Sequence, residues 1–208
     1  MIFVDDLGLE IFILAFVGFL LAYAAASILL AFRRKNEDEV KERLSSLAIP
    51  TGIIGMFVMV MSIAGELLWP IPAFNGRGYD ILFFDAFSLL GILLISLSFS
   101  ICLKKRLEYS GLLAFMFGIT VIYYGVTGYN LGMTKEPLSM LGLYGLFGLS
   151  GVLALPAAMA MDKALRSPQI SRQWFAWAYA FVVFMVLSAL VSIIVAGPAI
   201  AAHLAKAP

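Results

Sequence analysis

Two glutamates, Glu10 and Glu66, lie inside long apolar stretches of the sequence, where an ionisable group needs a specific reason to be present. Removing a charge from water is costly, so a carboxylate at such a depth should face the interior of a helix bundle and have a partner. Arg77 could pair with Glu66, and the hydroxyl of Tyr124 could donate a hydrogen bond to it. Together with Asp85, these residues predict a pocket for a small cation or solute; a structural ion pair that fixes the neighbouring loop is the alternative.

Three acids, Asp6, Asp85 and Glu136, have a simpler interpretation as helix caps. Each precedes or opens an apolar stretch, and a carboxylate at a helix N-terminus accepts free backbone N–H groups and meets the positive end of the helix dipole. Pro137 follows Glu136 at a position where the first turn of a helix accepts proline. Glu66 does not fit this interpretation, because it approaches the C-terminal end of its predicted helix.

The sequence offers no convincing catalytic or metal-binding group. Ser150 and His203 resemble the pair of a serine hydrolase, but Ser150 should lie about 18 Å deep in its helix, whereas His203 lies close to the chain end. A general base must reach its nucleophile through a hydrogen bond, so we interpret Ser150 as a packing residue. One histidine and one cysteine cannot supply a zinc site or two haem ligands of the same kind. We therefore expect a protein that is not an enzyme and that holds no metal or cofactor.

Six apolar stretches, each long enough to cross a bilayer, fill most of the 208 residues. Hydrophobic residues make up 62% of the chain and charged residues 13%, against roughly half and a quarter in soluble domains. A hydrocarbon core of about 30 Å requires ~20 helical residues. The pattern predicts an all-α bundle of six transmembrane helices that forms one domain over residues 1–208. The helices are expected at residues 8–32, 47–69, 84–103, 109–130, 138–161 and 174–200.

Basic residues mark one face of this bundle. Eleven of the fourteen follow predicted helices 1, 3 and 5, namely Arg33, Arg34, Lys35, Lys41, Arg43, Lys104, Lys105, Arg106, Lys163, Arg166 and Arg172. Cytoplasmic loops carry the excess of Lys and Arg, so these loops should lie inside the cell and both chain termini outside. The start lacks the features of a signal peptide, so we expect the first helix to remain. The composition indicates a multi-pass protein of the cell membrane, and the net charge of +1 gives no indication of nucleic acid binding.

Glycines recur at regular spacing along predicted helices 4 and 5, at Gly111, Gly118, Gly125, Gly142, Gly145 and Gly148. Small residues let helix backbones approach closely in lipid, where no hydrophobic force drives helices together. We interpret these six residues as helix contacts. The same faces could also serve assembly with a membrane protein partner or with a second copy of the chain.

Residues 79–91 are echoed, with one insertion, by residues 129–142. Both segments are predicted to enter the membrane from the same face. The similarity predicts two related hairpins, formed by helices 2 and 3 and by helices 4 and 5, with helices 1 and 6 added. A chance match within such a restricted composition is the alternative.

One turn carries a more specific pattern, because Trp-Pro-Ile-Pro at residues 69–72 is followed by Tyr-Asp-Ile-Leu-Phe-Phe-Asp at residues 79–85. With this turn and its acidic start, the chain resembles a mostly archaeal family of small polytopic membrane proteins of unknown function. Those proteins share a Trp-Pro-x-Pro turn followed by a Tyr-[Asn/Asp]-Ile-Leu-Phe-x-Asp segment. The chain departs from that pattern by extra residues at 74–78. The resemblance implies a polytopic membrane fold and assigns no reaction.

Two functions of different classes are consistent with these features. The first is binding or passage of a small cation or solute through an outward-facing pocket lined by Glu66, Glu10, Asp85, Arg77 and Tyr124. The second is a role as an accessory or assembly subunit of a larger membrane complex, packed through its glycine-rich faces. A transporter should contain a water-accessible cavity that reaches the middle of the membrane, whereas an accessory subunit should not.

The distribution of basic residues makes the orientation testable with single cysteines. In a Cys102→Ser background, a cysteine at Asn75 should react with a membrane-impermeant thiol reagent applied to intact cells. A cysteine at Asn36 should react only after the cells are opened. The reverse labelling pattern would show that the basic loops face outward.

Overall fold

The computed structural model describes residues 6–68, 78–134, 136–167 and 171–205, and these residues form six helices. The helices are α1 (Asp6–Arg33), α2 (Glu37–Leu68), α3 (Tyr79–Cys102), α4 (Glu108–Asn130), α5 (Pro137–Ala164) and α6 (Arg172–Ala205). Each contains a segment long and apolar enough to cross a membrane. The predicted all-α fold with six such helices is confirmed.

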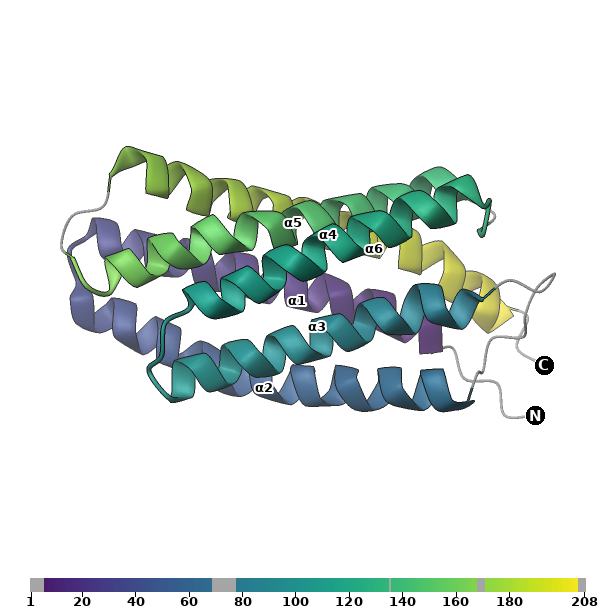
Figure 1. The fold of residues 1–208 in the computed structure, drawn as a ribbon, viewed down its shortest axis with the longest axis horizontal. Helices are drawn as coiled ribbons and strands as arrows, with labels where there is room; N and C mark the ends of the chain where they lie inside the picture. The colour runs from purple at the N-terminus through teal and green to yellow at the C-terminus, as the bar shows by residue number, and fades with distance from the viewer. Residues whose placement is uncertain (1–5, 69–77, 135, 168–170, 206–208) are drawn as a thin grey trace.

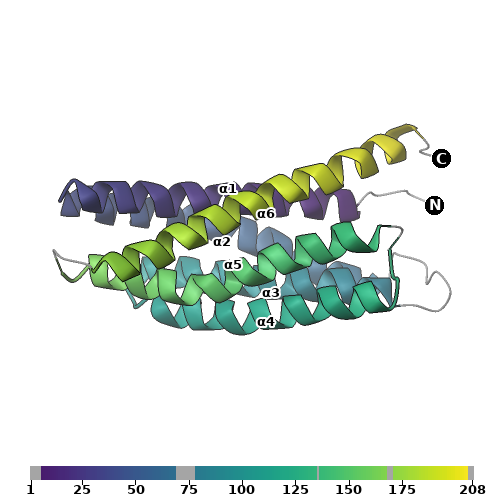
Figure 2. The same cartoon turned by 90° about the horizontal axis from the view of Figure 1, so that it is seen from above.

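The helices run along one long axis, so that their connections gather at two ends (Figures 1 and 2). The turns after α1, α3 and α5 lie at one end, which we call the basic end because Arg34, Lys35 and Lys104 are there. The start of α1, the end of α2, the start of α3 and the α4–α5 turn lie at the other end, which we call the acidic end. Glu10 and Glu66 belong to the acidic end.

Three helix pairs pack most extensively, and each has a glycine at its contact: α4 with α5, α2 with α3, and α1 with α6. A Cβ added to Gly118 of α4 would lie 2.5 Å from the carbonyl oxygen of Gly148 in α5. A Cβ on Gly55 of α2 would lie 2.9 Å from a backbone nitrogen of α3, and one on Gly18 of α1 would lie 2.9 Å from the Ala189 Cβ of α6. Real Cβ atoms do not approach other atoms so closely, so these contacts require glycine.

The six glycines expected at helix contacts divide into two groups. Gly111, Gly118, Gly125 and Gly148 lie against the partner helix of the α4–α5 pair or side chains between the two, where a Cβ would collide. Gly142 and Gly145 do not, because a Cβ on either would meet nothing within 4 Å. Three residues fall about 60° short of a full helical turn, so the row of glycines drifts around α5, and of these three glycines only Gly148 packs against α4. The expected contacts at these two positions are therefore absent within the described residues.

Helix α2 begins at Glu37, ten residues before the predicted start at 47. The Asn36 side chain explains this, because its Oδ1 accepts the Glu39 N–H at 3.1 Å and its Nδ2 donates to Glu39 Oε2 at 3.2 Å. Arg43 pairs with Glu39 one turn later, at 2.6 Å. This asparagine cap satisfies a backbone N–H that a helix start leaves free, so the helix extends beyond the apolar stretch into the polar segment.

Asp162 of α5 fixes the start of α4 at the basic end. Its two carboxylate oxygens accept the backbone N–H groups of Leu107 and Glu108, at 3.0 and 2.9 Å. The side chain is buried, so this carboxylate replaces water for two N–H groups and also meets the positive end of the α4 dipole. The first turn of α4 is thus capped from a neighbouring helix rather than from its own sequence.

The two echoed segments have different local structures. Tyr79 is the first residue of α3, whereas Tyr129 lies in the last turn of α4. Gly91 packs against the backbone of Met59 in α2, but the equivalent Gly142 faces open space. The helices nonetheless pair as the echo indicated, α2 with α3 and α4 with α5.

Leucine substitutions at Gly118 and Gly145 should show which of these glycines lies at a helix contact and which faces open space. Gly118→Leu should lower the melting temperature in detergent, because overpacking typically costs about 1–3 kcal/mol and here the neighbouring atoms are backbone. Gly145→Leu should change the free energy of unfolding by less than about 0.5 kcal/mol, as at other surface positions. Equal losses of stability in both variants would contradict the structure, in which Gly118 contacts α5 and Gly145 has no neighbour within 4 Å.

Candidate functional site

Four polar side chains from three helices meet at the acidic end, and we call them the acidic-end cluster: Glu66 of α2, Asp85 and Ser88 of α3, and Tyr124 of α4. The Tyr124 hydroxyl donates to Asp85 Oδ2 at 2.7 Å, and the Ser88 hydroxyl donates to Glu66 Oε1 at 2.9 Å. Asp85 and Ser88 are three residues apart and therefore lie on one face of α3. This geometry brings together three of the five residues predicted to line a pocket.

Glu66 lies at the surface of the bundle, which corrects the expectation that it would be buried. Its neighbour Gly65 takes the inward position instead, packed against the Phe84 ring of α3. Because successive residues on a helix point in different directions, Glu66 is turned away from the interior, beside the exposed Leu67. The expected polar partner exists, but it is Ser88. Arg77, the other predicted partner, lies outside the described residues.

Asp85 is not a helix cap, because α3 begins six residues earlier, at Tyr79. Its carboxylate is half-buried and binds the Tyr124 hydroxyl rather than the first N–H groups of the helix. Glu136 does occupy the N-cap position of α5, yet its side chain caps no backbone N–H and instead accepts the Ser139 hydroxyl at 3.0 Å. The side chain of Asp6 lies outside the described part of the structure.

Deeper in the bundle, Glu10 of α1 and Tyr144 of α5 extend the polar region. Glu10 is 1% exposed, and the Tyr144 hydroxyl donates to the carbonyl oxygen of Leu82 at 2.7 Å. Asp80, in the first turn of α3, is equally buried. Sequence reasoning missed Tyr144, whose only signal was a phenol inside an apolar stretch.

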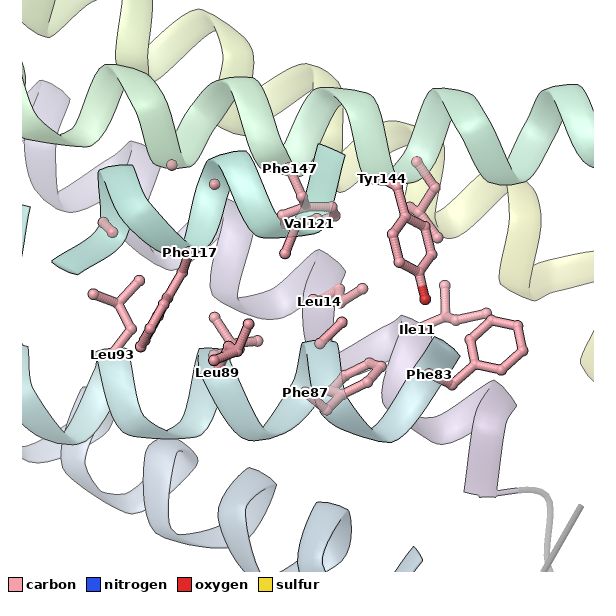
Figure 3. A pocket seen from close by; sticks show the side chains of 16 residues that line it. Ile11, Leu14, Phe83, Phe87, Leu89, Leu93, Phe117, Val121, Tyr144 and Phe147 are labelled. Carbon is pink, nitrogen blue, oxygen red and sulfur yellow. The ribbon is translucent and has the colours of Figure 1, made fainter. Parts of the chain in front are cut away.

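An apolar chamber lies between the cluster and the basic end. It consists of two adjacent cavities with volumes of about 100 and 170 Å³. Both cavities are lined by Leu90, Leu93, Ala114, Phe147 and Gly151. Figure 3 shows the cavity nearer the acidic end, with Phe117 and Leu93 at one side and Tyr144 at the other. The cavity nearer the acidic end thus lies among α1, α3, α4 and α5, and the other cavity is also lined by α2 and α6.

The acidic-end cluster adjoins this chamber directly. Asp85 lies four residues before Leu89, which lines the chamber, and Tyr124 lies three residues after Val121, which also lines it. Residues three or four apart stack on one helix face, so Tyr124 sits one turn beyond the chamber wall on α4, while on α3 Asp85 lies level with the wall, between the lining residues Phe83 and Ala86. Tyr144 lines the chamber itself.

The few polar groups in the chamber wall are already hydrogen-bonded. Ser110 bonds to Ser100 at 2.9 Å, and Ser150 bonds to the Leu146 carbonyl at 2.8 Å and to Ser188 at 3.1 Å. A buried water needs two to four polar partners, so such a cavity stays dry. The apolar side chains that line the cavities lack contacts on that side, which favours filling by an apolar group.

These features can be compared with known proteins. The model of the family described as "Protein of unknown function (DUF981)" matches residues 1–206. The chain belongs to this family. No curated protein and no solved structure matches the chain. Membership of the DUF981 family agrees with the resemblance to membrane proteins of unknown function and brings no reaction with it.

Within the described part of this DUF981 protein, no three His, Cys, Asp or Glu side chains are grouped closely enough to hold a metal ion. The cluster offers two carboxylates and two hydroxyls instead. Carboxylates that accept hydroxyl donors, next to tyrosine rings, are groups that can bind an organic cation through charge-assisted hydrogen bonds and ring contact.

The Asp85–Tyr124 bond can be measured in this DUF981 protein with a double-mutant cycle. Tyr124→Phe should reduce the free energy of unfolding by about 1.5–3 kcal/mol, because a half-buried carboxylate loses its donor. Its effect should shrink when Asp85 is already Asn. Tyr123→Phe, a change at the exposed neighbour, is the matched control. Additive effects of the Asp85 and Tyr124 changes would contradict the bond.

Proposed function

We propose that this protein binds a small organic cation of the ammonium class at its acidic end and catalyses no reaction. The arrangement of Glu66 and Asp85 carries the proposal. Each carboxylate receives a hydroxyl hydrogen bond on one oxygen, from Ser88 or Tyr124. A carboxylate has lone pairs on both oxygens, so the second oxygen of each can accept N–H donors of a cation.

An ammonium cation fits these groups better than a metal ion does. Calcium and magnesium take six or more oxygen ligands, which two carboxylates on separate helices do not supply. The Tyr123 and Tyr124 rings lie next to each other, with centroids 6.4 Å apart, and the Tyr124 hydroxyl bonds to Asp85. Aromatic faces attract organic ammonium groups, which adds to the attraction of the carboxylates.

The apolar chamber favours binding of a cation at the acidic end over its passage through the bundle. A hydrated ion that moved through the bundle would have to cross a long apolar space whose wall serines are already paired. Placing a charge in such surroundings is strongly unfavourable. The pairing of Ser150 with Ser188 likewise supports a packing role for this serine rather than a catalytic one.

The site would face the outside of the cell membrane. The basic end holds the Lys- and Arg-rich turns, and the positive-inside rule assigns such turns to the cytoplasm. The acidic-end cluster would then be reached from outside, where Glu66 is exposed.

Titration with propylammonium tests the proposal on the full-length protein in lipid nanodiscs. Glu66→Gln and Asp85→Asn should each weaken binding by about 10- to 150-fold, because a charge-assisted hydrogen bond contributes about 1.5–3 kcal/mol. Glu136→Gln is the matched control, since it removes a carboxylate at the same end that binds Ser139 and lies outside the cluster. Equal affinity in the wild type and in a Glu66→Gln/Asp85→Asn double variant would overturn the proposal.

An accessory role in a larger complex has one observation in its favour. Gly142 and Gly145 lie on an open face of α5, next to the exposed Leu138 and Leu149. A helix of another chain could approach such a face closely. Loss of a defined co-purifying membrane protein in Gly145→Leu, together with unchanged stability, would favour this role over ligand binding.

A further inference from the structure

We propose that the apolar chamber holds the hydrocarbon chain of a single-chain cationic amphiphile whose ammonium head lies at the acidic-end cluster. This proposal rests on the proposed function and specifies its ligand. The proposed ligand would occupy two neighbouring parts of the structure. One is the acidic-end cluster of carboxylates and hydroxyls, and the other is the apolar chamber next to it.

The chamber has the shape of one extended chain. Along α1 its lining runs from Ile11 to Ile28, and along α5 it runs from Leu143 to Met161. With a rise of 1.5 Å per residue, each of these stretches covers about 25 Å. The cavity volumes of about 100 and 170 Å³ are small for such a length, so the space is narrow. A single hydrocarbon chain fills a long narrow space, whereas a compact solute would fill only part of it.

The chemistry of the wall selects a chain without polar groups. Tyr144, Ser110 and Ser150 are the polar residues that line the two cavities, and each is already hydrogen-bonded to the protein. A polar tail would therefore lose its own hydrogen bonds without replacement. An apolar chain instead supplies the dispersion contacts that an empty cavity lacks.

The seam between α3 and α4 gives such a chain a route from the bilayer. These two helices pack less extensively than the three main pairs. Hydrogen bonds join them near each end, Tyr124 with Asp85 at the acidic end and Ser110 with Ser100 nearer the basic end. Between these bonds the seam consists of half-buried apolar side chains, including Leu93 and Phe117, which lie beside each other in Figure 3.

The carboxylates of the acidic-end cluster determine which charge the head group of the ligand carries. The lining of the chamber ends at Phe83 on α3 and at Val121 on α4, which places the head of such a chain beside Asp85 and Tyr124. A cationic head would meet the carboxylates of Asp85 and Glu66 there, whereas an anionic head would be repelled. The ligand class is therefore a long-chain ammonium rather than a phosphate- or carboxylate-headed lipid.

Photolabelling in nanodiscs tests this proposal with the full-length protein. The probe is a long-chain alkylammonium with a diazirine near the end of its chain, and an alcohol with the same chain is the uncharged comparison. The ammonium probe should label chamber residues such as Phe117 and Phe147, as identified by mass spectrometry of peptides. Leu93→Trp should fill the chamber and reduce that labelling several-fold. Ile92→Trp, a change at the adjacent exposed position, should not.

Variants of a second chamber residue and of the two carboxylates complete the test. Leu90→Phe also reduces the chamber volume and replaces Leu93→Trp if that variant does not elute as a folded protein in size-exclusion chromatography. Glu66→Gln and Asp85→Asn should lower chamber labelling by the ammonium probe and leave labelling by the alcohol unchanged.

The outcomes separate this proposal from the proposed function. Propylammonium binding without chamber labelling by the long-chain probe would overturn the chain site and leave the cation site standing. Equal chamber labelling by both probes, unaffected by Glu66→Gln and Asp85→Asn, would overturn the cationic amphiphile. Absence of both propylammonium binding and chamber labelling would overturn both proposals.

Discussion

Close backbone contact at glycine is the constraint on which this bundle depends. Lipid is as apolar as a leucine side chain, so burial of apolar surface does not hold membrane helices together, and close packing must do so. Gly118 against Gly148, Gly55 against the α3 backbone, and Gly18 against Ala189 provide such packing in the three main pairs. Because each pair is held by its own glycine, the seams between pairs carry bulkier side chains. The apolar chamber lies along these looser seams.

Hydrogen bonds then set how the pairs sit against one another. Tyr124 and Asp85 join the α4–α5 pair to the α2–α3 pair at the acidic end, and the Tyr144 hydroxyl joins α5 to the Leu82 carbonyl of α3. Ser150 and Ser188 join α5 to α6 in the interior. Each of these three bonds connects two different pairs, whereas the Ser88–Glu66 bond lies within the α2–α3 pair. The bonds between pairs orient the pairs, and the Tyr124–Asp85 bond brings a carboxylate and a tyrosine to the edge of the chamber.

The sequence predicted the helices well and the directions of their side chains less well. Helix number follows from apolar length, because about 20 residues are needed to cross the hydrocarbon core. The face that a residue occupies does not follow from hydropathy, since lipid and protein interior are both apolar. Glu66 was expected inside and lies at the surface, while Gly142 and Gly145 face open space rather than a helix. Asp85 and Tyr124 were expected to line one pocket because both are polar and lie at the same depth, but the Tyr124 hydroxyl was expected to bond to Glu66 and bonds to Asp85 instead.

The order of polar and apolar zones along the bundle limits what the acidic end can do. The half-buried carboxylate of Asp85 gains from a nearby cation, because a positive partner offsets the cost of keeping its charge away from water. That gain ends one turn further in, where the wall becomes apolar and its serines are already paired. Moving a cation from Asp85 and Glu66 into the chamber would therefore cost free energy, so the cation remains at the acidic end. Only an uncharged, apolar extension of the same ligand can continue into the chamber, so one molecule with two chemically different ends matches the site better than a free ion.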